Sequence, residues 1–257
     1  MHTTKEKVAD LDLEMVRGGQ GHPLLVLHGF QTLDPASPFL TELGKHASVI
    51  APSHPGFGGS PRPKDFETVY DLVHLYLALI DAMPHDKVSV LGLSFGGWLA
   101  AEIAVKAGRR LDKLILVDAL GIKISDRETP DILDVFNTHP DKVVQHSWHD
   151  PATNGPDYDA MEDAQIITRA RNWDALCLYG WHPYMYNPQL KRWLTRIKAP
   201  TAVYWGATDG IVKPAYGEAY AKLIPGARFE QIASAGHHPE IEQPDVLAER
   251  VGHFLRS

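Results

Sequence analysis

Cysteine is almost absent from this sequence of 257 residues, which has a single one at Cys177. No disulfide can therefore form within the chain. That is typical of proteins from a reducing compartment, and we expect a cytoplasmic location. Residues 1–19 lack the apolar core of a secretory signal peptide, which agrees with this expectation.

Positive charge is also scarce, because 25 Lys and Arg residues stand against 32 Asp and Glu, a formal net charge of −7. Nucleic-acid binding needs a basic face, and binding to anionic lipid needs a polybasic patch, so neither partner is expected. The longest nearly apolar stretch, residues 72–83, is too short to cross a bilayer. The expected partner is a small molecule, and the chain is either a monomer or a homodimer.

Short apolar runs alternate with longer segments of helical spacing. We predict strands at the apolar runs 23–29, 47–53, 87–93, 112–119 and 200–206, and one more strand at 227–233. The segments of helical spacing are residues 67–83, 95–108, 214–224 and 244–255. Strands without polar alternation are buried on both faces, as in parallel sheets. The sequence therefore predicts an α/β fold with a mostly parallel central sheet flanked by helices.

The segment 121–192 breaks this alternation, since it is rich in Asp, His, Pro and aromatic residues and has no convincing buried strand. Its helical patterns are residues 131–136, 160–176 and 188–194. Ligands bind at the carboxyl edge of open α/β sheets, so a helical insertion there is expected to form a cap. Residues 1–120 and 193–257 would then form the core and 121–192 the cap; ordinary crossover helices are the alternative.

The stretch "GLSFGGW", residues 92–98, lies between a predicted strand and a predicted helix. This context is that of a nucleophile elbow, in which a strained turn exposes a serine hydroxyl and glycines allow close backbone packing. A serine hydroxyl is a weak nucleophile without an adjacent base. Ser94 is therefore either a nucleophile or an ordinary serine in a glycine-rich turn, and the rest of the chain has to supply its partners.

Four segments follow predicted strands in a fixed order: "LHGF" at 27–30, "GLSFGG" at 92–97, "WGATDG" at 205–210 and "SAGHHPEIEQP" at 234–244. This set strongly resembles the α/β-hydrolase superfamily over essentially the whole chain, and least across the cap. The resemblance implies a serine hydrolase without a cofactor. Its nucleophile would be Ser94, and the oxyanion hole would be formed by the backbone N–H groups of Phe30 and Phe95.

The resemblance also implies a base and an acid. In the family, a Gly-His pair is followed by a glutamate five residues after the histidine and a proline two further on, which His237 fits with Glu242 in register. The neighbouring His238 would line the pocket or pack on its rim. The acid is expected to be Asp209, after the penultimate strand. Asp118, at the end of an earlier strand, is the alternative.

Two departures from the family bear on the reaction. Hydrolases of meta-cleavage products, which cut carbon–carbon bonds, usually have Asn before the nucleophile and Trp after the catalytic histidine, where this chain has Leu93 and His238. The acidic residue usual before "PG" is replaced in "PSHPG" by Ser53 and His54. The resemblance thus favours a carboxylesterase-like enzyme, with carbon–carbon hydrolysis and a non-catalytic binding protein as alternatives.

The expected substrate is an ester with a small to medium, apolar or aromatic acyl or alcohol group. The predicted pocket residues are His28, Trp181, Tyr184 and His238, although His28 is expected to support its loop rather than transfer protons. The cap is dense in aromatic side chains, which either enclose the substrate or form the core of the cap. Arg169 and Arg171 either meet a substrate carboxylate or are solvated. The histidines in "HSWH" at 146–149 do not form a defined ligand set, so no metal site is expected.

Overall fold

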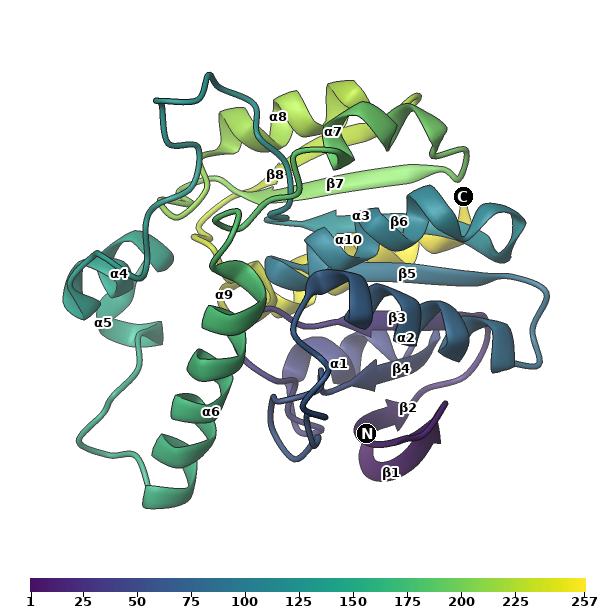
Figure 1. The fold of residues 1–257 in the computed structure, drawn as a ribbon, viewed down its shortest axis with the longest axis horizontal. Coiled ribbons are helices and arrows are strands. Elements are labelled where there is room, and N and C mark those ends of the chain that lie inside the picture. The colour runs from purple at the N-terminus through teal and green to yellow at the C-terminus, as the bar shows by residue number, and fades with distance from the viewer.

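The computed structural model describes residues 1–257, and its centre is one eight-stranded sheet in the order β1-β2-β4-β3-β5-β6-β7-β8 (Figure 1). From β3 onward all neighbouring strands are parallel. These strands are β3 (Pro23–Leu27), β4 (Ser48–Pro52), β5 (Val88–Leu93), β6 (Leu111–Val117), β7 (Thr201–Gly206) and β8 (Arg228–Ile232). The predicted fold class is confirmed.

Helices cover both faces of this sheet. On one face lie α2 (Val69–Ala82), α3 (Phe95–Lys106) and α8 (Pro214–Leu223), and on the other α1 (Pro38–Leu43), α9 (Pro239–Glu242) and α10 (Pro244–Arg256). Successive residues of each central strand point to opposite faces. In β5, for example, Val90 belongs to the core under α3, and Leu91 belongs to the core under α10.

The edge of the sheet formed by β1 (His2–Val8) and β2 (Leu11–Gly18) was not predicted. These two strands form an antiparallel hairpin, and β2 joins β4 in the antiparallel sense. In β1 most side chains are exposed or half-buried, so its sequence "HTTKEKV" lacks the continuous apolar run of a central strand. An edge hairpin of this kind is hard to detect when apolar runs are the main signal.

The segment between β6 and β7 adds no strand to the sheet. It contains α4 (Pro140–Ser147), α5 (Pro151–Asn154), α6 (Asp163–Gly180) and α7 (Leu190–Trp193), and α4 to α6 stand beyond one end of the sheet in Figure 1. The chain also has two short 3-10 turns, at Gly108–Arg110 and Leu194–Arg196. None of the helices combines the length and the apolar character needed to cross a bilayer.

Of the three helices predicted within this segment, one is present, one is shortened and one is absent. The helical pattern at 160–176 corresponds to α6, and that at 188–194 is reduced to the single turn of α7 and the 3-10 turn after it. The predicted helix at 131–136 is wrong. Leu133 donates its backbone N–H to the Ile211 carbonyl, and Ile132 forms a β-bridge with Val212, so the backbone there is extended. A contact with a distant segment has overridden the local pattern.

Candidate active site

Ser94 occupies a strained turn between β5 and α3, with φ 49° and ψ −114°. Non-glycine residues rarely adopt positive φ, and such strain persists only where the surroundings impose it. The glycines around it leave the space that this turn needs. A Cβ at Gly92 would overlap the Gly96 carbonyl, and one at Gly96 would overlap the Leu27 carbonyl. The turn thus presents the Ser94 hydroxyl beyond the carboxyl end of β5.

A chain of hydrogen bonds joins Ser94, His237 and Asp209. Ser94 Oγ lies 2.7 Å from His237 Nε2, and His237 Nδ1 lies 2.8 Å from Asp209 Oδ2. The other carboxylate oxygen of Asp209 accepts the backbone N–H groups of Ile211 at 2.8 Å and Val212 at 2.9 Å. The three predicted residues come together from loops after three different strands, and the acid is oriented by its own turn.

The electrostatics of this chain suit a proton-accepting imidazole. Burial by itself lowers the pKa of His237, but the charge of Asp209 and its hydrogen bond outweigh burial, and the pKa lies above 6.5. With Nδ1 donating to Asp209, the unprotonated Nε2 faces the Ser94 hydroxyl. The arrangement can therefore accept the serine proton and stabilise the imidazolium that results.

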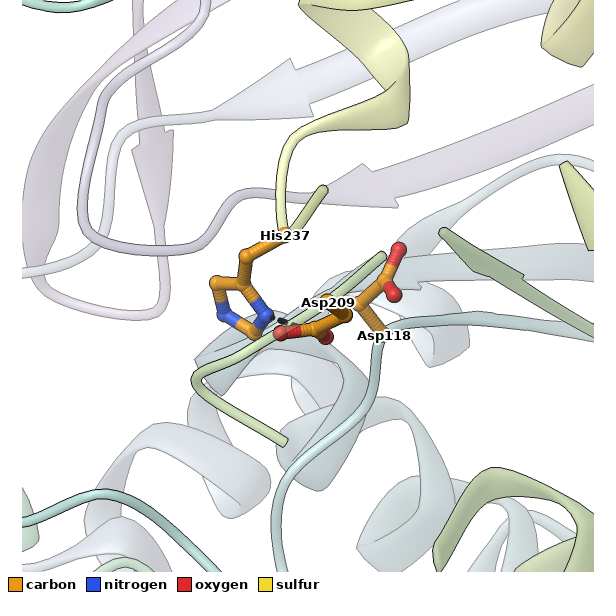
Figure 2. A group of neighbouring side chains, drawn as sticks. All are labelled: Asp118, Asp209 and His237. Atoms are coloured by element: carbon orange, nitrogen blue, oxygen red, sulfur yellow. Dashed lines mark hydrogen bonds and ion pairs between the residues drawn. The ribbon is translucent and has the colours of Figure 1, made fainter. Parts of the chain in front are cut away.

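Asp118, the alternative acid, lies beside Asp209 but makes no hydrogen bond to His237 (Figure 2). One of its carboxyl oxygens accepts the Gly206 N–H at 2.9 Å, and the other is buried without a partner. Burial first, and then the charge of Asp209, raise the pKa of Asp118 well above its usual value. These effects favour the protonated, neutral form of Asp118, which is unsuited to orienting and stabilising an imidazolium.

Asp118, Asp209 and His237 are also the one set of three potential metal-ligand atoms that lie within 4.8 Å of one another. In Figure 2 the His237 ring faces Asp209, while the Asp118 carboxyl turns away from the ring. His237 Nδ1 and Asp209 Oδ2 already share a hydrogen bond, and His237 Nε2 faces the Ser94 hydroxyl. The residues therefore fit a proton relay better than a metal centre, and the histidines at 146 and 149 are not part of the set.

The predicted oxyanion donors are both free to bind a ligand. Phe95 is the first residue of α3, where a backbone N–H has no partner within the helix. The Phe30 N–H makes no backbone or side-chain hydrogen bond in the protein. Unpaired backbone N–H groups, above all one at a helix N-terminus, are groups that bind anions, and both residues line the cavity that contains Ser94.

His28 holds the peptide unit that carries the Phe30 N–H. Its Nε2 accepts the His54 backbone N–H at 2.9 Å, so its Nδ1 carries the proton and donates to the Gly29 carbonyl at 2.7 Å. Burial lowers the pKa of His28 to about 4, which keeps the ring neutral. In a planar trans peptide the C=O and N–H point in opposite directions. Holding the Gly29 carbonyl therefore aims the Phe30 N–H, and His28 lies behind the site rather than on its wall.

A small apolar cavity of about 80 Å³ opens at Ser94 and His237. Eleven of its fifteen lining residues are hydrophobic, and none is Lys or Arg. Tyr184 and His238 line it as predicted, whereas Trp181 does not, since it is 65% exposed and stands outside. Tyr184 also donates its hydroxyl to the Leu133 carbonyl at 2.6 Å, and it thereby joins two parts of the inserted segment.

A larger groove of about 490 Å³ continues outward from this cavity between α4 and α6. The groove shares part of its wall with the cavity, including Phe30, Trp173 and His238. Arg169 is its one Lys or Arg. The Arg169 guanidinium lies 4.9 Å from the ring centre of Phe30 and forms no ion pair. From the sequence, Arg169 is expected either to bind a substrate carboxylate or to be solvated. Neither hypothesis includes its stacking on Phe30.

Two supports of the site were missed by the sequence analysis. Glu242 accepts the Gly236 N–H at 2.6 Å and the His149 N–H at 2.9 Å, while the Ser147 carbonyl accepts the His237 N–H at 2.7 Å. The loop that bears His237 is thus bound to the end of α4. The sequence indicates Glu242 only through its register with His237, and "HSWH" only as an undefined metal motif, because the contact between these two loops leaves no local pattern.

The second support lies at the loop that lacks the usual acidic residue before "PG". Glu14 of β2 accepts the Ser53 hydroxyl at 3.1 Å and the Gly59 N–H at 3.2 Å. Ser60 closes the turn by donating to the Ser53 carbonyl at 2.7 Å. A carboxylate from a neighbouring strand is therefore bound to the loop in which the family's usual acidic residue is absent. The sequence could not reveal this, because β2 was not recognised as a strand.

Comparison with known proteins bears on the family of this chain. A model of the alpha/beta hydrolase family matches residues 24–250. The chain is 27% identical to the poly(3-hydroxyalkanoate) depolymerase of Ectopseudomonas oleovorans, an alignment that covers 94% of this chain and 87% of the relative. It is 26% identical to a 2-hydroxymuconate semialdehyde hydrolase of a Pseudomonas species, strain CF600, covering 92% and 88%.

Among solved structures, a bacterial membrane phospholipase A superposes with a TM-score of 0.81 at 21% identity, over 99% of this chain and 86% of the other. At that identity the likeness concerns the fold. Together with the family model, which spans most of the sequence, it leads to one conclusion: this chain belongs to the alpha/beta hydrolase family.

Proposed function

We propose that the protein is a serine hydrolase that cleaves carboxylic esters through an acyl-enzyme. The single observation that carries the proposal is the unbroken chain of hydrogen bonds from Asp209 through His237 to Ser94. A serine hydroxyl becomes a useful nucleophile when a base can take its proton as it attacks. The family relationship supports hydrolysis in general, and the ester specificity and serine mechanism are our inference.

In the proposed reaction Ser94 Oγ attacks the ester carbonyl and its proton passes to His237 Nε2. The carbonyl oxygen becomes an oxyanion, which the N–H groups of Phe30 and Phe95 stabilise. The tetrahedral intermediate then expels the alcohol, which takes the proton from His237, and the acyl group stays on Ser94. Water repeats these steps on the acyl-enzyme, with His237 again as the base, and releases the acid.

The walls of the cavity favour a neutral, apolar ester. A substrate carboxylate in the inner cavity would lose its hydration without meeting a Lys or Arg there, which is costly. The dienoic keto acids cleaved at a carbon–carbon bond carry such a carboxylate. That reaction remains the second candidate because one relative is a 2-hydroxymuconate semialdehyde hydrolase. We also propose that residues 121–192 act as the cap of this site, since α4 and α6 form the walls of the outer groove.

Covalent labelling tests the proposal. The protein is treated with a fluorophosphonate probe, and the modified peptide is identified by mass spectrometry, with Ser94→Ala as control. We expect one adduct, on Ser94, and turnover of p-nitrophenyl esters that depends on acyl length. Turnover of a meta-cleavage dienoate in place of esters would select the carbon–carbon reaction. A folded protein with neither adduct nor turnover would support a non-catalytic binding role and overturn the proposal.

A further inference from the structure

Asn172 is a buried amide on α6 that reaches two loops of the sheet domain. Its side chain is almost fully enclosed, with 4% of the residue exposed. Its Oδ1 accepts the Gly58 N–H at 3.0 Å, and its Nδ2 donates to the Phe30 carbonyl at 3.2 Å. A buried polar group that bonds at both ends contributes to a defined arrangement, and it is costly to leave either partner unpaired.

Two neighbours of Asn172 on the same helix also contact Phe30. The Arg169 guanidinium stacks over the Phe30 ring, and the ring of Trp173 meets it edge-on with the centroids 5.6 Å apart. Residues at i, i+3 and i+4 lie on one face of a helix, so α6 turns one face toward Phe30. Arg169 and Trp173 contact the ring, whereas Asn172 alone binds the backbone.

The backbone after Phe30 has few other constraints. Residues 31–33 lie outside every helix and strand, and their backbone groups make no hydrogen bonds within the protein. On the other side of Phe30, the Gly29 carbonyl is held by His28. His28 thus holds the peptide unit that contains the Phe30 N–H, and Asn172 holds the next peptide unit, which contains the Phe30 carbonyl. Only the second contact comes from the inserted segment.

We propose that Asn172 is a positioning residue for the oxyanion hole: by holding the Phe30 carbonyl, which belongs to the peptide unit after the one that carries the Phe30 N–H, it restricts rotation of the Phe30 backbone and so reinforces the donor direction that His28 sets while α6 is seated on the sheet domain. The inference rests on the proposed function, in which the Phe30 N–H stabilises the oxyanion. It also implies that α6 does more than enclose substrate. Small errors in the placement of a catalytic group have large effects on rate.

Two substitutions separate the hydrogen bond from packing. Asn172→Ala removes both contacts. Asn172→Asp keeps the size and the acceptor for Gly58 but, when ionised, cannot donate to the Phe30 carbonyl. A matched control is Ala175→Gly, one turn along, which loosens the same helix through its lower propensity and leaves both hydrogen bonds in place. Circular dichroism and thermal melting establish that each variant is folded. If Asn172→Ala does not fold, Asn172→Asp alone tests the hydrogen bond to the Phe30 carbonyl.

The readouts are kcat and KM for p-nitrophenyl butyrate and the Ki of phenylboronic acid, which forms a tetrahedral adduct with an active-site serine. We expect both Asn172 variants to lower kcat about 10- to 100-fold, with KM within about twofold. The Ki of the boronic acid should rise by a similar factor, because such adducts resemble the transition state. The Asn172→Asp deficit relative to the parent should shrink as pH falls, since a protonated carboxyl can donate again.

Other results overturn the inference. An unchanged kcat, a rise in KM alone, or an equal loss in Ala175→Gly would show that Asn172 serves only packing of the inserted segment. If the parent protein neither hydrolyses the ester nor takes the fluorophosphonate on Ser94, the proposed function fails, and this inference falls with it. If the parent protein hydrolyses the ester and the Asn172 variants keep its kcat, only the positioning role of Asn172 is rejected and the proposed function stands.

Discussion

The turns at the carboxyl end of the sheet and the inserted segment 121–192 hold their side chains in different ways. Ser94 is placed by its immediate neighbours, because the glycines around it admit one tight path of the backbone. The inserted segment is held by scattered contacts with distant residues, such as Asn172 with Phe30 and Ser147 with His237. Ser94 is thus positioned by local sterics, whereas the inserted segment is positioned by a few polar contacts with distant residues.

Removing the nucleophile should have the largest effect. Ser94→Ala should lower kcat for ester hydrolysis by at least about 10⁴-fold, because only the oxyanion donors and substrate binding remain. The glycines that shape the turn are unchanged, so the thermal unfolding midpoint should stay close to that of the parent. Steady-state kinetics and melting curves measure both. Substantial turnover in this variant would place the nucleophile elsewhere.

The two carboxyl groups beside His237 offer a matched pair within the turns. Asp209→Asn should lower kcat about 10⁴-fold, because the amide neither stabilises the imidazolium nor holds the required tautomer. Asp118→Asn should lower it less than about tenfold, since Asp118 does not contact His237 and is expected to be neutral already. Parallel kinetics on the two variants decide between them, and a reversed order would assign the acid role to Asp118.

The pH dependence of kcat/KM should follow the ionisation of His237. Its neutral form is the base, and Asp209 raises its pKa above 6.5 despite burial. The kcat/KM should therefore rise by about tenfold per pH unit on the acid side and level off above a midpoint higher than 6.5. In Asp209→Asn the charge is gone and burial remains, so the midpoint of the residual activity should move to lower pH. A midpoint unaffected by this substitution would mean that another group titrates.

The smallest effects of this series are expected for two tryptophans of the inserted segment, which differ in location. Trp173 lines both the cavity and the groove, whereas Trp181 is exposed and lines neither. Trp173→Ala should change KM several-fold and shift the preferred ester length, while Trp181→Ala should stay within about twofold of the parent. Kinetics over a series of p-nitrophenyl esters test this. Equal effects of the two substitutions would place Trp181 in the substrate path.

Prediction from the sequence succeeded where local pattern and structure coincide. The strands β3 to β7 are largely buried and read as apolar runs, and the predicted helical pattern at 160–176 corresponds to α6. The predicted strand at 227–233 corresponds to β8, although most of its side chains are exposed or half-buried. Prediction failed at the β1–β2 hairpin, whose outer strand is largely exposed, and at residues 131–136, which pair with 211–212. The helices α4 and α5 were missed as well. Both begin at a proline that follows a capping side chain, a short-range signal with little periodicity behind it.

The sequence by itself determined the α/β fold and the identity of the serine, histidine and acid candidates, because each follows a predicted strand in a recognisable turn. Only the tertiary structure decided between Asp209 and Asp118 for contact with His237, moved His28 behind the site and Trp181 outside it, and brought Glu14 and Asn172 to loops far away in the chain. The physical reason is range. Local sterics and periodicity depend on residues that are neighbours in the sequence, whereas a hydrogen bond between distant segments forms only when the chain has packed.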